Sequence, residues 1–134
     1  MLVNMKKRII SLLACLFVWT FSLMAQDISE KTVAAFREGN SQELNKYLSD
    51  KIDLIIQGRP VYADRSKAEE AMTAFFSAHK VRGFSVNHQG KRDDSGFIIG
   101  TLTTVDGVFR VNYFFRKVEG RYSVHQIKIN KTDE

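Results

Sequence analysis

At 134 residues the chain is long enough for one domain and too short for two. Its net charge of +5 comes largely from Lys6, Lys7 and Arg8, and the rest has 17 basic and 15 acidic residues, a net of +2 without the clustered basic face of a nucleic-acid-binding protein. The single cysteine, Cys15, lies in the same N-terminal region, which leaves the remainder without a disulfide, a thiol nucleophile or a cysteine metal site.

The chain begins with the pattern of a secretory signal peptide. A basic start, residues 6–8, precedes 17 uncharged, mostly apolar residues that end at Ala25. We expect cleavage near this position, removal of residues 1–25, and export of residues 26–134 to the periplasm or the exterior as one domain without a membrane span. Two alternatives remain: an uncleaved anchor, because the apolar run reaches the short limit for a span, and a lipoprotein, because the sequence LLAC ending at Cys15 resembles a lipobox.

Two short helices are expected at the start of this domain. In the sequence DISEKTVAAFREGN, apolar residues such as Phe36 share one helical face, an Asp or a Ser can cap the first turn, and Gly39 ends the segment. The next segment, over residues 40–48, places Leu44 and Leu48 on one stripe.

A strand and a longer helix follow. The sequence KIDLIIQ, residues 51–57, alternates in the manner of a strand, and the Gly-Arg-Pro that follows is expected to end it. Ser66 and Glu69 then have the spacing of a capping box. Residues with helical spacing extend this helix to position 79: Ala68, Ala71, Met72, Phe75, Phe76 and His79.

Strand-like runs make up the rest of the chain. They cover residues 81–89, 96–105, 108–118 and 121–129 and are separated by short turn sequences. Helices followed by a meander of strands predict an α+β fold in which the helices cover one face of a curved antiparallel sheet.

Several short motifs resemble a known family. They are FREGN, SKAEEAMTAFF, the H-x-G at residues 88–90, IGTL at 99–102, GVFRV at 107–111 and the closing IKI. Together they resemble domain of unknown function 4783, a family of small exported proteins found chiefly in Bacteroidetes. The order of elements is similar to the nuclear transport factor 2-like superfamily, and this resemblance implies a sheet wrapped around its helices to leave a conical pocket. It implies no catalytic residues, because the family has none established, and superfamily members include isomerases, dehydratases and many proteins that only bind.

The hairpin at residues 100–115, GTLTTVDGVFRVNYFF, predicts which side chains face the core. A two-residue Asp106-Gly107 turn would pair Gly100 with Tyr113 and leave room for the tyrosine ring. The mostly apolar face of this hairpin would then be the core face, with Tyr113 inside and Arg110 outside.

The alternation of side chains between the two faces of each strand also predicts which residues line a pocket. In the last strand, Ile127 and Ile129 can face the core only if an odd-length or bulged turn shifts the alternation, and His125 then joins them near Tyr113. His88 lies two residues after Val86 and four after Phe84 in one strand, so it is expected on the same, core-facing side as these apolar residues. The predicted pocket residues are Tyr113, His125, His88, Tyr62 and Gln57, with Asp53 possible at the rim.

Three functional hypotheses follow from this set. His125 and Tyr113 could move protons as in an isomerase or dehydratase, since imidazole titrates near neutral pH. Asp53, however, alternates with core residues and is expected outside, which leaves no buried carboxylate base. The other two hypotheses are a non-enzymatic domain that binds a small or lipidic ligand or a partner protein, which we favour, and a structural envelope module with a filled core.

The outer face of the sheet offers a second candidate surface. Phe97, Ile99 and Phe114 form an apolar patch there, with Arg110 at its edge, and exposed patches of this kind often mark interfaces. We expect contact with an envelope protein or with a second copy of the chain. No cofactor or metal is expected, because the three histidines have no ligand spacing.

Overall fold

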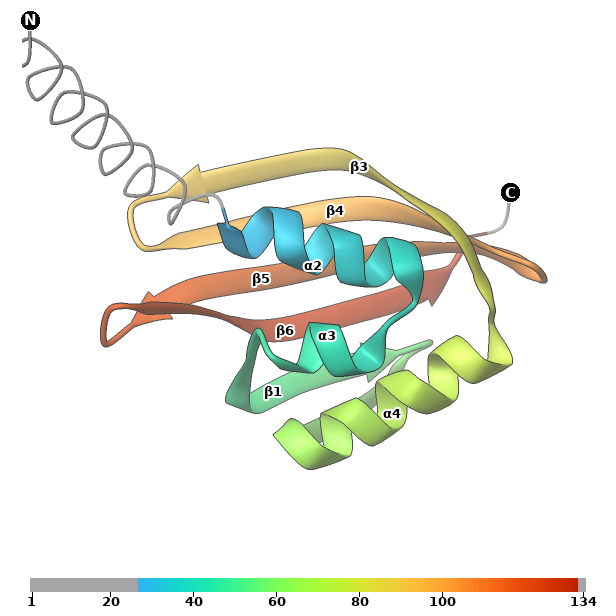
Figure 1. The fold of residues 1–134 in the computed structure, drawn as a ribbon, viewed down its shortest axis with the longest axis horizontal. Coiled ribbons are helices and arrows are strands. Elements are labelled where there is room, and N and C mark those ends of the chain that lie inside the picture. Colours follow the sequence, from blue (N-terminus) through green and yellow to red (C-terminus); the bar gives the residue numbers. More distant parts are fainter. Residues whose placement is uncertain (1–26, 133–134) are drawn as a thin grey trace, which may run out of the picture.

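The computed structural model describes residues 27–132, so the predicted signal peptide lies outside the described residues. Within these residues the helices lie beside a long, curved sheet (Figure 1). The helices are α2 (Asp27–Glu38), α3 (Ser41–Asn45) and α4 (Arg65–Ala78). The strands are β1 (Leu48–Ile56), β2 (Arg59–Asp64), β3 (Val81–Arg92), β4 (Ser95–Thr104), β5 (Gly107–Val118) and β6 (Arg121–Lys131). The predicted α+β class is therefore confirmed.

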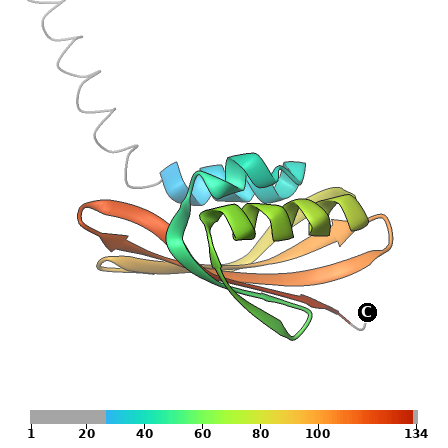
Figure 2. The same cartoon turned by 90° about the horizontal axis from the view of Figure 1, so that it is seen from below.

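All strands form one sheet in the order β2-β1-β6-β5-β4-β3. Neighbours are antiparallel except β1 and β6, which run parallel. The helices lie together on one side, with α2 over β3 and β4 and α4 over β1 and β2 (Figure 2). We call the side under the helices the inner face and the opposite side the outer face. In the described part of the chain no helix is long and apolar enough to cross a membrane.

Strand β2 was not predicted from the sequence. The predicted strand over residues 51–57 was expected to end at Gly58-Arg59-Pro60, with no strand directly after it. Residues 57 and 58 instead form a tight turn, and Pro60 pairs with Ile55 in a strand at the edge of the sheet. An edge strand tolerates proline because one side of its backbone needs no ladder hydrogen bond.

The helix starts differ in part from expectation. The helix α4 begins at Arg65 and is capped by Asp64, whose carboxylate accepts a hydrogen bond from the Lys67 amide at 2.8 Å, so the predicted cap at Ser66 is wrong. Asn40, the first residue of the segment predicted as the second helix, caps α3, and its side chain accepts a hydrogen bond from the Glu43 amide at 3.1 Å.

The β4–β5 hairpin has the predicted faces but a different register. Its turn is Val105-Asp106 rather than Asp106-Gly107, so that Gly100 pairs with Val111. The Thr104 hydroxyl holds this turn by contacting the Asp106 carboxylate at 3.0 Å and the carbonyl oxygen of residue 107 at 2.7 Å. Because the shift is two residues, every side chain keeps its predicted face. The predicted pairing of Gly100 with Tyr113 is wrong.

Aromatic rings fill the space between the helices and the inner face. Phe36 of α2 is fully buried and stacks on Phe84 and Tyr113, with ring centroids 5.3 Å and 5.2 Å away. Phe75 of α4 meets Phe109 edge to face at 5.1 Å. The region in which the resemblance implied a conical pocket is thus occupied by these side chains.

Candidate binding groove on the outer face

The predicted acid–base pair, Tyr113 and His125, is not brought together. Tyr113 is fully buried on the inner face, and its hydroxyl lies 2.9 Å from that of Thr32. Thr32 also donates to the Ile28 carbonyl at 2.7 Å, so Tyr113 donates to Thr32. Burial raises the pKa of the Tyr113 phenol far above its ordinary value, which keeps it neutral.

His125 lies on the other side of the sheet because it is the extra residue of a bulge. Val124 pairs with Phe115 and Gln126 pairs with Phe114, which leaves His125 between them without a partner residue in β5. The predicted bulge exists, but it interrupts the strand and not the turn at Glu119-Gly120. Ile127 therefore returns to the inner face while His125 does not, and the predicted inward position of His125 is wrong.

The other predicted pocket residues also lie away from the interior. A bulge between Val86 and His88 turns His88 to the outer face, opposite Ile99, where it is exposed. Tyr62 is 69% exposed at the sheet edge, and Gln57 is exposed in the β1–β2 turn. These residues do not form a common pocket with Tyr113.

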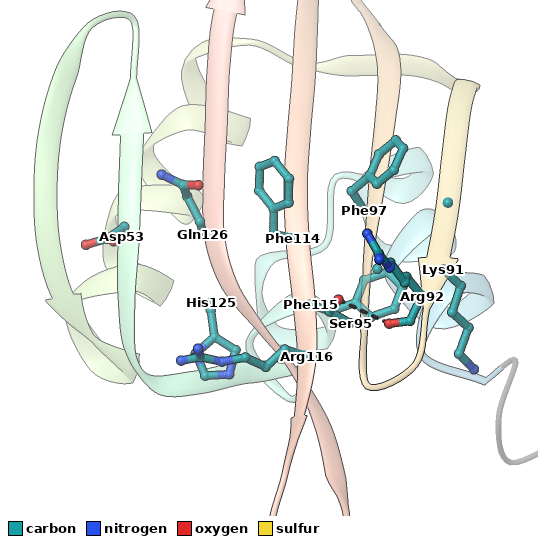
Figure 3. Close-up of a pocket in the computed structure, with 12 residues that line it drawn as sticks. Asp53, Lys91, Arg92, Ser95, Phe97, Phe114, Phe115, Arg116, His125 and Gln126 are labelled. Atoms are coloured by element: carbon teal, nitrogen blue, oxygen red, sulfur yellow. Dashed lines mark hydrogen bonds between the residues drawn. The ribbon is translucent and has the colours of Figure 1, made fainter.

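A groove of about 670 Å³ instead crosses the outer face, the side away from the helices (Figure 3). Two neighbouring rows of residues, each running from strand to strand, account for most of its lining. Its lining residues are Asp53, Gly90, Lys91, Arg92, Ser95, Gly96, Phe97, Phe114, Phe115, Arg116, His125 and Gln126.

The first row, which we call the aromatic row, is apolar at its centre. The pairings join Gly90 to Phe97, Phe97 to Phe114, Phe114 to Gln126, and Gln126 to Asp53. The ring centroids of Phe97 and Phe114 are 6.4 Å apart. The first ring lies over Gly90, where an added Cβ would come within 2.5 Å of the Phe97 Cε1 atom.

The second row, which we call the cationic row, lies two residues further along the strands. Arg92 pairs with Ser95, Ser95 with Arg116, and Arg116 with Ser123. Among residues 27–132, no carboxylate forms an ion pair with Arg92 or Arg116. The two guanidinium groups at this end of the groove are therefore not in direct contact with a carboxylate of the described residues.

His125 is hydrogen-bonded within the cationic row. Its Nδ1 atom lies 3.4 Å from an Arg116 nitrogen, and its Nε2 atom lies 3.2 Å from the Ser123 hydroxyl. A guanidinium only donates, so Nδ1 accepts and the proton is on Nε2. Partial burial, and then the charge of Arg116, lower the pKa of His125 below its ordinary value of 6.5, so the ring is neutral at pH 7.

We expect Arg116→Gln to raise the pKa of His125, because removal of the neighbouring positive charge makes the imidazolium less costly. The increase should be partial, since the burial remains. An NMR titration of the His125 ring protons measures this pKa. Arg110→Gln, on the same strand and face but outside the groove, should leave it unchanged, and an unchanged or lower value in Arg116→Gln would contradict the assigned contact.

The residues predicted for an outer interface are all found on the outer face. Phe97 and Phe114 form the floor of the groove, while Ile99 and Arg110 lie further along the same strands. The role of Arg92 was missed, because its sequence neighbourhood, KRDDS, has the composition of an ordinary solvated turn. Its position beside Arg116 depends on the register of three strands, for which the sequence contains no local signal. Within the described residues no cluster of histidines and carboxylates could hold a metal ion.

The family model of a domain of unknown function (DUF4783) matches residues 29–130. A DUF4783 family protein from Bacteroides uniformis is 65% identical, with a TM-score of 0.77, over 78% of this chain and 97% of that one. A second, from Bacteroides fragilis, is 58% identical, with a TM-score of 0.73, over 76% of this chain and 96% of that one. No match is found among curated proteins.

More distant structures show the fold. An NTF-2 like protein of unknown function from Silicibacter pomeroyi is 13% identical, with a TM-score of 0.61, over 84% of this chain and 98% of that one. The domain thus has the nuclear transport factor 2-like fold that the order of its elements implied.

Proposed function

This chain belongs to the DUF4783 family, and we propose that it is an exported, non-enzymatic binding domain that holds its ligand in the outer-face groove. The observation that carries the proposal is the position of the groove. Its 670 Å³ are in the range of small-molecule sites, and they lie on the outer face, whereas aromatic side chains fill the inner one.

The isomerase or dehydratase alternative receives less support. It required His125 and Tyr113 to meet at one substrate, and the two side chains lie on opposite faces of the sheet. A buried phenol with a raised pKa is also a poor proton donor or acceptor near neutral pH.

Native mass spectrometry of the chain purified from the envelope of its own cells tests this proposal. We expect a mature chain that begins near residue 26 and carries an added small-molecule mass. The Phe114→Ser variant should lose that mass, because the side chain is 45% exposed and forms the groove floor. Val105→Ser, which changes an exposed apolar residue of the β4–β5 turn, should retain it.

Two outcomes would overturn the proposal. One is a wild-type chain without added mass, and the other is an added mass that persists in Phe114→Ser. A doubled mass that depends on Phe114 would identify a second copy as the occupant of the groove. A chain that retains residues 1–25 would contradict the export with cleavage that the proposal includes.

A further inference from the structure

The two rows of the groove differ in chemistry, and the difference bears on what the groove can bind. Phe97 and Phe114 present ring surface at its centre, in two central strands of the sheet. Figure 3 shows the Phe114 ring between Gln126 on one side and Phe97 on the other, with Asp53 beyond Gln126 and the Arg92 side chain beside Phe97. A flat apolar group can lie across these rings without displacing a buried polar contact.

The positive charge is concentrated next to the rings. Arg92 and Arg116 flank Ser95 from the two neighbouring strands, so their backbones are about 10 Å apart. The Arg116 guanidinium is directed toward His125, with 3.4 Å between the two side-chain nitrogens (Figure 3). An anionic group between the two strands can accept hydrogen bonds from both arginines once the Arg116 side chain turns from His125 toward Ser95, and such bonds are stronger than those between neutral groups.

Among the described residues that line the groove there are one carboxylate, Asp53, and three cationic side chains, Lys91, Arg92 and Arg116. The Lys91 ammonium lies over the Tyr122 ring at 4.9 Å from its centroid. The carboxylate that lines the groove, Asp53, belongs to β1, at the far end of the aromatic row from Arg92. An anion is thus attracted to one end of the groove and repelled from the other, which fixes the direction of the ligand.

We propose that the groove selects a small molecule with a flat apolar body and one terminal anionic group, a carboxylate, sulfonate or phosphate. The apolar body lies on Phe97 and Phe114, and the anionic group lies between Arg92 and Arg116. This inference rests on the proposed function, and it adds the chemical class of the ligand. A small molecule is favoured over a protein segment because the groove has the volume of a small-molecule site.

A pair of matched probes tests the charge selection directly. Naphthalene-2-carboxylate and its neutral amide have the same ring, and their binding can be followed by ¹H–¹⁵N NMR titration of the purified domain. We expect the backbone N–H signals of β4 and β5 to shift most. The carboxylate probe should bind about five- to tenfold more tightly than the neutral probe, as for a partly exposed charged hydrogen bond. This advantage should shrink as salt is added.

Variants assign the effect to residues. In Arg116→Gln the carboxylate should lose most of its advantage while the amide binds as before, and Arg92→Gln should behave in the same way. Arg110→Gln, an arginine of the same strand and face outside the groove, should change neither affinity. Circular dichroism of each variant checks that the fold is retained.

Different results would overturn the charge selection and the proposed binding function. Equal affinity for carboxylate and amide, or an advantage that survives in both groove variants, overturns the charge selection. If Phe114 is still required for the native added mass, the groove remains a binding site of another chemistry. Tighter binding of an acetylated peptide that alternates phenylalanine and glutamate would identify a protein segment as the occupant and overturn the small-molecule assignment.

Discussion

The substitution Phe36→Ala is expected to lower the free energy of unfolding by about 3–5 kcal/mol, the usual range for a large aromatic side chain removed from a packed core. Phe36 is fully buried and contacts three other rings, those of Phe76, Phe84 and Tyr113. This side chain of α2 lies against Phe84 of β3 and Tyr113 of β5, so the cavity would lie at the junction of the helix and the sheet. Urea unfolding followed by circular dichroism measures the effect.

The outer face supplies the matched control for this experiment. Phe114 is also a phenylalanine but is 45% exposed, so Phe114→Ala should cost less than about 1.5 kcal/mol. A similar loss in both variants would contradict the assignment of the two faces. It would mean that the groove floor stabilises the fold as much as the core does.

The second large effect is expected from a single added methyl group. Gly100 lies in β4, and a Cβ at this position would come within 2.6 Å of Phe84 Cε1 and 2.9 Å of the Ser85 carbonyl oxygen. Because a backbone atom is involved, the clash cannot be relieved by a rotamer change alone. Gly100→Ala should therefore lower the free energy of unfolding by about 1–3 kcal/mol.

Gly83→Ala is the control for Gly100→Ala. Gly83 belongs to the neighbouring strand β3, and an added Cβ there meets no atom within 4 Å. Its substitution should leave the stability unchanged or raise it by up to about 1 kcal/mol, because alanine restricts the unfolded chain. Equal losses at the two glycines would show that strand propensity, and not contact with Phe84, determines the cost.

The residues that face the core were predictable wherever alternation continued without interruption. In β4 and β5, the apolar period of two survives even a wrong turn position, because a shift of two residues does not exchange the faces. Strand β2 was missed for the opposite reason. It lies at the edge, and nearly all its side chains are exposed, so the core imposes no apolar pattern on it.

The aromatic floor of the candidate site, Phe97 and Phe114, was predicted on the outer face, but the polar part of the site was not, because the positions of its residues depend on bulges and on long-range register. One extra residue in β6 and one in β3 turn His125 and His88 to the outer face. The positions of Ile127 and Ile129 showed that the alternation of faces had to change before them. They did not show at which residue it changes. The proximity of Arg92 to Arg116 similarly arises from two strand pairings, neither of which follows from local composition.

The position of β6 has a consequence for the order of assembly. Strand β6 follows the other strands of the described sheet in sequence but lies between β1 and β5, where it joins the β1–β2 hairpin to the β3–β4–β5 meander. Before residues 121–131 emerge, the growing chain can form these two pieces but cannot join them into one sheet. Such a long-range closure is slow to form and leaves apolar surface exposed until it is complete. The sheet thus closes only after synthesis of residues 121–131, and the folding of the whole domain waits for this segment.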